Sequence, residues 1–173
     1  MKREFLGDSF DAVKRLWRDT LQEWAPLHAE SRFIPEELRA DFTRLTKIPV
    51  FPVIPTRSFS IFNDPDTGIR LPGEANQKEG QSHISIDTIS QQLRMDHLKC
   101  VVTFDQSHYR HSKGSHSEQR RSKMREIESN GFHAFYYVSH APFLFAAPTA
   151  QLLSELKGIL NAAGIPVTRF EDP

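Results

Sequence analysis

The sequence has little cysteine, no excess of charge of either sign and no long apolar run. Its 173 residues include a single cysteine, Cys100, which excludes a disulfide framework and a thiolate metal cluster. Lys plus Arg and Asp plus Glu both number 22, which argues against coating of nucleic acid through bulk charge. No apolar segment approaches the roughly 18 residues that cross a bilayer, and the N-terminus lacks the apolar core of a signal peptide. We therefore expect a cytoplasmic protein without a membrane partner.

Short motifs that identify common cofactor sites are also missing. Neither Gly-x-Gly-x-x-Gly nor a phosphate loop ending in Gly-Lys-Ser/Thr occurs, and the eight histidines show no His-Glu-x-x-His and no zinc spacing. These absences argue against a dinucleotide-binding fingerprint, a phosphate-loop nucleotidase and a zinc protease. The cofactor therefore has to be inferred from other residues, and S-adenosylmethionine, Mg²⁺ and Mn²⁺ all remain open.

What is present is an alternation of helical and strand patterns. Helical spacing or capping residues predict helices at 10–24, 35–45, 84–93, 118–130 and 149–163, whereas apolar runs predict strands at 59–62, 97–104, 133–148 (in two pieces) and 165–170. Such alternation favours an α/β fold: a mostly parallel sheet with helices on both faces, a Rossmann-like three-layer sandwich. We expect one domain over 1–173, with a mainly helical part at 1–50 and a sheet-forming core at 58–170.

Two of the predicted strands run directly into polar residues. The first is followed by Asp64-Pro-Asp66-Thr-Gly68, and the second by Asp105-Gln106-Ser107. In an open α/β sheet ligands bind outside the carboxyl ends of the strands, so parallel neighbours would bring these residues to one edge. The first sequence is also an ideal turn, because Asp side chains bond backbone amides and Gly closes the bend. His140 follows another apolar strand and is a further catalytic candidate, although a buried histidine bonded within the fold explains it as well.

Three motifs carry a resemblance to known proteins. Gly7-Asp8-x-x-Asp11-x-x-Lys14, Asp64-Pro-Asp66-Thr-Gly68 and the strand ending in Asp105-Gln106 resemble a group of uncharacterised bacterial proteins, and more loosely the large-subunit ribosomal RNA adenine-N6 methyltransferases. The second resemblance implies a class I, Rossmann-like fold in which the strand before Asp64-Pro65 holds the target amine. Position by position, the resemblance covers Gly7, Asp8, Asp11 and Lys14 of the first motif and Asp64-Pro65 at the start of the second. Together with the residues at the strand ends, the candidate site comprises catalytic Asp64, Asp66, Asp105 and His140, and cofactor-binding Asp8, Asp11, Lys14, Gly68, Gln106 and Ser107.

The chain departs from those methyltransferases in two places. Asp66 and Thr67 stand where the family has the proline and the aromatic residue that clamp a flat base. The glycine-rich loop that would cradle S-adenosylmethionine is missing, since only about fifty residues precede the strand of Asp64. The resemblance therefore implies the fold more directly than the activity.

Three functions remain open from the sequence. The first is a reduced methyltransferase-like enzyme with an acidic pocket at the strand ends, acting on a nucleotide or nucleic acid. The second is a Mg²⁺- or Mn²⁺-dependent phosphoryl hydrolase or nuclease, whose hard oxygen ligands would be Asp8, Asp64, Asp66 and Asp105. The third is a non-enzymatic binding protein whose acids form turns. Both enzyme hypotheses require Asp64 and Asp105 to face the same side of the sheet.

Overall fold

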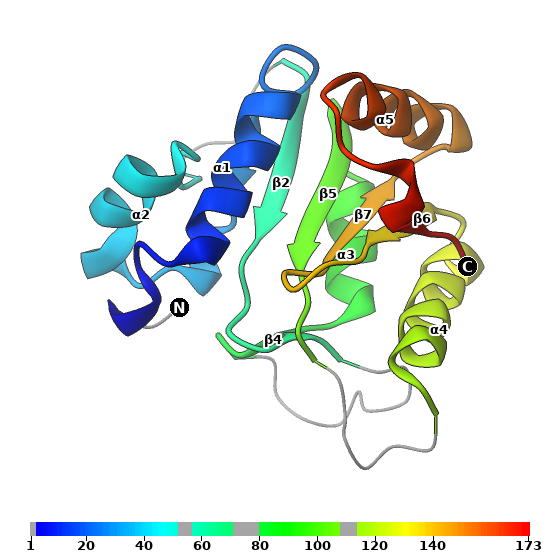
Figure 1. Ribbon diagram of the computed structural model, residues 1–173, viewed down its shortest axis with the longest axis horizontal. Coiled ribbons are helices and arrows are strands. Elements are labelled where there is room, and N and C mark those ends of the chain that lie inside the picture. Colours follow the sequence, from blue (N-terminus) through cyan, green and yellow to red (C-terminus); the bar gives the residue numbers. More distant parts are fainter. Residues whose placement is uncertain (1–2, 52–56, 71–79, 108–113) are drawn as a thin grey trace.

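The chain folds into a single α/β domain built on a six-stranded sheet flanked by helices (Figure 1). The structure is a computed structural model and describes residues 3–51, 57–70, 80–107 and 114–173. Residues 1–2, 52–56, 71–79 and 108–113 lie outside these ranges; the last three segments belong to a proline-rich part of the sequence and to two polar stretches.

The helices lie close to where the sequence patterns predict them. They are α1 (Ser9–Leu21), α2 (Arg39–Thr46), α3 (Ile86–Leu93), α4 (His116–Ser129) and α5 (Ala150–Ala162). The ends are set by local chemistry, because Asp8 caps α1 through its side chain and Ser115 with Glu118 forms a capping box on α4. After α4, Gly131 adopts a φ of 84°, the left-handed conformation with which helices commonly end.

The main sheet has the strand order β1-β2-β5-β7-β6-β8. Its strands are β1 (Leu27–Ala29), β2 (Phe59–Asn63), β5 (Leu98–Phe104), β6 (His133–Tyr137), β7 (Phe143–Ala147) and β8 (Phe170–Glu171), and a small second sheet pairs β3 (Gly68–Ile69) with β4 (His83–Ile84). The strands β1, β2 and β5 pair in parallel, and β7 lies antiparallel between β5 and β6. Four strands, β1, β2, β5 and β6, therefore share one direction, as the mostly parallel prediction requires.

Two strands differ from expectation. β1, in the part expected to be mainly helical, was not predicted, because three residues are too few to show a strand pattern. At the other end of the chain, the strand expected at 165–170 is mostly a 3-10 turn, Val167–Arg169, and only Phe170 and Glu171 pair with β6. Pro166 precedes that turn and removes a backbone donor that a paired strand would need.

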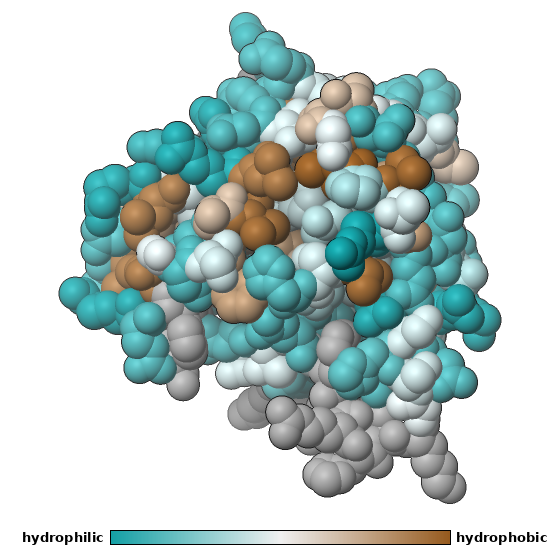
Figure 2. All heavy atoms as spheres, in the orientation of Figure 1, coloured by the Kyte–Doolittle hydropathy of each residue, from teal (hydrophilic) through white to brown (hydrophobic). Residues whose placement is uncertain are grey.

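Aromatic side chains form the contact between α1 and the sheet. Trp17 is fully buried and its ring lies edge-on to Tyr137, Phe143 and Phe145, at centroid distances of 5.0, 5.7 and 5.2 Å. In Figure 2 apolar atoms appear over α1 and along the space between α1 and α5, within a mostly hydrophilic surface. This packing fixes α1 against the sheet and so determines where its first turn lies.

A second set of contacts joins α3 to the strands. The Asn63 amide exchanges hydrogen bonds with the Gln92 amide at 2.8 and 3.0 Å and donates to Thr103 at 3.2 Å. Cys100 is also buried, donates to the Ser60 hydroxyl, and has its thiol pKa raised by burial to about 12. None of the helices described here is both long enough and apolar enough to cross a membrane.

Candidate functional site

A pocket of about 110 Å³ opens at the carboxyl ends of β2 and β5, beside the first turn of α1. In Figure 1 both strands point toward this end of the molecule. The pocket is lined by Asp8, Phe10, Lys14, Asp64, Pro65, Asp66, Phe104 and Gln106. The structure thus brings together five of the residues predicted from the sequence, and the sheet edge at which they meet is the one where α/β proteins bind ligands.

The centre of the pocket wall is an ion pair between α1 and the end of β2. The Lys14 ammonium donates to Asp64 Oδ2 at 2.8 Å and to Asp11 Oδ1 at 3.1 Å, and all three residues are buried. Burial opposes the charge on Lys14, but attraction by Asp64 and Asp11 outweighs it and raises the pKa of the lysine. Burial also raises the pKa of the Asp64 carboxyl, against the pull of Lys14. No described residue donates to the second oxygen, Asp64 Oδ1.

The first turn of α1 is closed by its own carboxylates. Asp8 Oδ1 accepts hydrogen bonds from the backbone N–H groups of Phe10 and Asp11 at 2.9 and 3.2 Å. The Asp11 carboxylate accepts from the N–H of Gly7 at 2.7 Å as well as from Lys14. The Gly-Asp-x-x-Asp-x-x-Lys motif therefore builds a capped helix end that carries Lys14 to Asp64.

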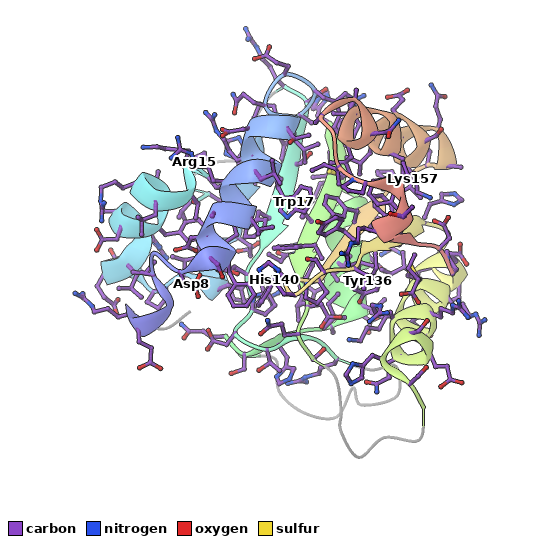
Figure 3. All side chains as sticks on the ribbon, viewed as in Figure 1. Asp8, Arg15, Trp17, Tyr136, His140 and Lys157 are labelled. Atoms are coloured by element: carbon purple, nitrogen blue, oxygen red, sulfur yellow. The ribbon has the colours of Figure 1, made fainter. Side chains whose placement is uncertain are left out.

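Two phenylalanine rings give the pocket its apolar wall. Phe10 lies edge-on to Phe104, with ring centroids 5.4 Å apart. The His140 ring also packs against Phe10, with ring centroids 5.7 Å apart, and its backbone carbonyl accepts a hydrogen bond of 3.4 Å from the Gln106 side chain. His140 is exposed and does not line the pocket, so the structure places it beside the site (Figure 3).

The turn after β2 is held by the small sheet. The N–H of Asp66 donates to Gln81 at 3.2 Å, and that of Thr67 donates to Ser82 at 2.8 Å. The carbonyl of Thr67 in turn accepts from the N–H of Gln106 at 2.9 Å, which ties this turn to the end of β5. The Asp-Pro-Asp-Thr-Gly sequence is therefore both a structured turn and part of the pocket wall.

Asp105 belongs to a separate, fully buried cluster. Its Oδ2 accepts from Lys123 at 2.7 Å and from the Tyr136 hydroxyl at 2.6 Å, and its Oδ1 accepts from the N–H groups of Ile69 and Ser107 at 2.9 and 3.1 Å. The Ser107 hydroxyl bonds the same carboxylate, and its oxygen also accepts from Lys123. Asp105, Lys123 and Tyr136 have no exposed surface, so this cluster joins α4, β6 and β3 to β5.

Asp64 and Asp105 face different sides of the sheet. Side chains alternate along a strand, and Phe104 with Gln106 faces the pocket, so Asp105 between them points away. In Figure 3 Asp8 lies at the end of α1, well separated from Tyr136, which binds Asp105. The predicted grouping of Asp105 and Ser107 with Asp64 in one site is therefore not formed. Within the described residues, no three His, Cys, Asp or Glu side chains lie close enough together to hold a metal ion. The metal site predicted from Asp8, Asp64, Asp66 and Asp105 is therefore not formed.

No family model, curated protein or solved structure matches this chain. The geometry of the pocket is therefore the feature of this chain that bears on its function.

Four residues that shape the pocket and the Asp105 cluster were not predicted from the sequence. Lys123 and Tyr136 hold Asp105, and Phe10 with Phe104 forms the pocket wall. The two phenylalanines carried a usable signal, since each lies within two residues of a predicted site residue. Lys123 carried none, because it stands among charged residues that are typical of a solvated helix.

The Asp105 cluster predicts a specific pH dependence of stability. Burial opposes ionisation of Asp105, but Lys123 and the hydrogen bonds from Ser107 and Tyr136 outweigh it and lower the pKa of this carboxyl. A lowered pKa stabilises the fold at every pH above the unfolded value of about 4, and this stabilisation is lost as the pH falls toward the folded value. The stability difference between the native chain and the neutral pair Asp105→Asn with Lys123→Met, which leaves no buried charge, should therefore be constant from pH 5 to 7.

Below pH 4 the stability of the native chain relative to that neutral pair should fall by about 1 kcal/mol for each pH unit, because only the native chain's unfolded state gains the extra proton. Urea unfolding of both proteins between pH 3 and 7 measures it. The Asp41→Asn variant, which removes an exposed carboxylate on α2, should show little difference from the native chain at any pH. A difference between the native chain and the neutral pair that stayed constant down to pH 3 would contradict the assignment.

Proposed function

We propose that this chain is a binding protein with a reduced methyltransferase-like fold, whose pocket takes a planar ring that carries an exocyclic amine. The observation that carries the proposal is the position of Asp64. This carboxylate stands at the end of β2, is only 4% exposed, and lines a pocket whose other wall is the Phe10 and Phe104 pair. A buried acceptor beside aromatic rings suits a flat ligand with an N–H donor.

The order of the strands supports the methyltransferase-like and Rossmann-like part of the proposal. From β2 onward the sheet runs β2-β5-β7-β6, with β7 reversed between its neighbours. The resemblance to the adenine-N6 methyltransferases implies the same succession after the Asp-Pro turn: a strand, a helix, a strand in two pieces and a final helix. Two contacts support helices on both faces of the sheet. Trp17 of α1 packs on Phe143 of β7, and Gln92 of α3 bonds Asn63 of β2. Because side chains alternate along each strand, Phe143 and Asn63 point to opposite faces.

The dimensions of the pocket limit what it holds. Pockets that bury a drug-sized ligand measure roughly 300–1,000 Å³, whereas a cavity of about 150 Å³ takes a benzene ring. At about 110 Å³, with an open mouth, this pocket has room for one aromatic ring, while the rest of a larger ligand lies outside. The ring would stack against Phe10 or Phe104 and donate its amine hydrogen to Asp64 Oδ1.

The described residues do not fit S-adenosylmethionine. That cofactor needs a backbone cradle after the first strand of the sheet, where glycine lets the chain approach the ligand closely. Here β1 is followed by Glu30 and a 3-10 turn, Ser31–Phe33, and no glycine occurs between Gly7 and Gly68. We therefore derive no step through S-adenosylmethionine and assign the pocket a binding role.

Calorimetric titration with two matched pairs of nucleosides tests the proposal. Adenosine differs from inosine, and cytidine from uridine, chiefly by an exocyclic amine in place of a carbonyl. In at least one pair the amine-bearing member should bind tenfold or more tightly, because the other presents an acceptor to the Asp64 carboxylate and leaves it unpaired. Equal binding within both pairs, or no binding of any nucleoside, would contradict the proposal.

The variant Phe10→Leu tests the aromatic wall. It keeps an apolar side chain but removes the ring that packs against Phe104, and should weaken binding of the preferred nucleoside about tenfold. The matched control is Phe51→Leu, which removes a ring that packs on His28 and Phe59 away from the pocket, and it should leave the affinity unchanged. Thermal unfolding of both variants shows whether the fold is retained.

A further inference from the structure

We infer that Gln106 is a specificity-determining residue of the pocket, because its side-chain oxygen accepts the second hydrogen of the ligand's amine. The pocket thereby selects a primary amine over an amine that carries an alkyl group. This inference rests on the proposed function and narrows it, from any ring with an exocyclic amine to a ring with an unsubstituted one. Two features carry it: the position of Gln106 relative to Asp64, and the hydrogen bond that orients its amide.

The register of the strands places Gln106 beside Asp64 on the pocket side of the sheet. Asn63 is the partner of Thr103 in the parallel pair of β2 and β5. Asp64 therefore lies level with Phe104, and both line the pocket. Gln106 also lines it, two residues after Phe104 and so on the same side of the chain. Diagonal neighbours in a sheet lie roughly 7–8 Å apart, so both side chains can reach one small ligand.

The backbone holds the amide of Gln106 in one orientation. Its nitrogen donates to the carbonyl of His140 at 3.4 Å, and its backbone N–H donates to Thr67 at 2.9 Å. A carbonyl oxygen can only accept, so the amide nitrogen has to face His140 and the amide oxygen is turned away from it. His140 does not line the pocket whereas Gln106 does, so the amide oxygen is the end that faces the cavity. No described residue donates a hydrogen bond to that oxygen.

One primary amine can bond both acceptors. Its two hydrogens point about 120° apart in the plane of the ring, so with hydrogen bonds of about 2.9 Å its two acceptors lie about 5 Å apart. Side chains that start roughly 7–8 Å apart reach this separation by leaning toward each other. The pocket, at about 110 Å³, has room for one ring and so keeps the amine close to both groups. Asp64 accepts one hydrogen and Gln106 the other.

An N-alkyl amine cannot bond both acceptors, because it carries a single hydrogen. Gln106 is exposed, so its amide oxygen is solvated until a ligand covers it. A covered acceptor without a donor lowers the affinity by about fivefold or more. Stacking of the ring on Phe10 or Phe104 is the same for both ligands and does not contribute to the difference.

Calorimetric titration of a nucleoside and its N-methyl derivative, with the native chain and with Gln106→Met, tests the inference. The probes are adenosine with N6-methyladenosine, or cytidine with N4-methylcytidine, whichever nucleoside binds more tightly. The native chain should prefer the unmethylated member by about fivefold or more. Methionine has the length of glutamine but lacks the amide oxygen. In Gln106→Met the nucleoside should therefore bind about fivefold more weakly and its derivative should be nearly unaffected, so that the preference disappears.

The matched control is Gln151→Met on α5, where the amide nitrogen donates to Glu155 at 3.0 Å on an exposed face. It should leave both affinities unchanged, and thermal unfolding shows whether both variants keep the fold. An undiminished preference in Gln106→Met would mean that the methyl group is excluded by its size, and would overturn the inference while leaving the proposed function in place. Equal binding of the two probes by the native chain would do the same. Absence of binding by any nucleoside would overturn the proposed function and this inference together.

Discussion

Replacement of Lys123 by methionine should lower the free energy of unfolding by about 3 to 5 kcal/mol. The ammonium of Lys123 and the carboxylate of Asp105 are both completely buried and lie 2.7 Å apart. Methionine fills similar space but leaves Asp105 charged and without its cation, and an uncompensated buried charge is among the most costly defects in a protein interior. Urea unfolding at pH 7 measures the loss.

A double replacement separates the cost of the unpaired charge from the loss of packing. In Asp105→Asn with Lys123→Met no charge remains, and the amide oxygen of asparagine still accepts from Tyr136 or Ile69. Most of the lost stability should therefore return, as it does when buried ion pairs are replaced together by neutral groups. As a surface control, Lys157→Met breaks the more exposed pair with Asp172 and should cost less than 1 kcal/mol. A loss of under 1 kcal/mol in Lys123→Met would sink the assignment.

The parts of the fold that were predictable from the sequence are those set by local pattern. The strand before Asp64 and the strand before Asp105 are continuous apolar runs, and Asp8 stands directly before a helical repeat. Each of these signals lies within a few residues of the feature it determines. The edge at which Asp64, Asp66 and Gln106 meet followed from the direction of the strands.

What the sequence could not show is the register between those strands. Phe62 pairs with Val102, so Asp64 lies level with Phe104, and both share the side that faces α1. A shift of one residue would have put Asp105 into the pocket and Phe104 behind it, because side chains alternate. Register depends on packing between distant segments, and no local pattern in this chain specifies it.

The two buried clusters have different consequences for the site. The Lys14 and Asp64 pair lines the pocket and fixes the charge that a ligand meets. The Asp105 cluster does not line it, but Asp105 accepts from the N–H of Ile69, next to the turn that carries Asp66. We therefore assign Asp105 a positioning role: it holds the turn after β2 against the end of β5. The glycine of that turn gives the most direct test of this role.

Gly68→Ala should lower the free energy of unfolding by roughly 3 kcal/mol, combining overpacking with strain at a positive φ. Gly68 has a φ of 134°, and a Cβ added there would lie 2.1 Å from Asp105 Oδ1 and 2.8 Å from Asp105 Cα. Backbone cannot yield as a flexible side chain does, so either the turn or the end of β5 has to move. Because the turn carries Asp64 and Asp66 into the pocket, binding of the preferred nucleoside should fall with the stability.

A matched glycine distinguishes steric conflict from backbone strain. Gly131 also has a positive φ, of 84°, but a Cβ added there meets nothing within 4 Å. Gly131→Ala should therefore cost only about 1 kcal/mol, the strain alone, and should leave nucleoside binding unchanged. Urea unfolding and calorimetric titration of both variants give the comparison. Equal losses of stability in the two, or full binding by a folded Gly68→Ala protein, would show that contact between this turn and Asp105 does not position the pocket.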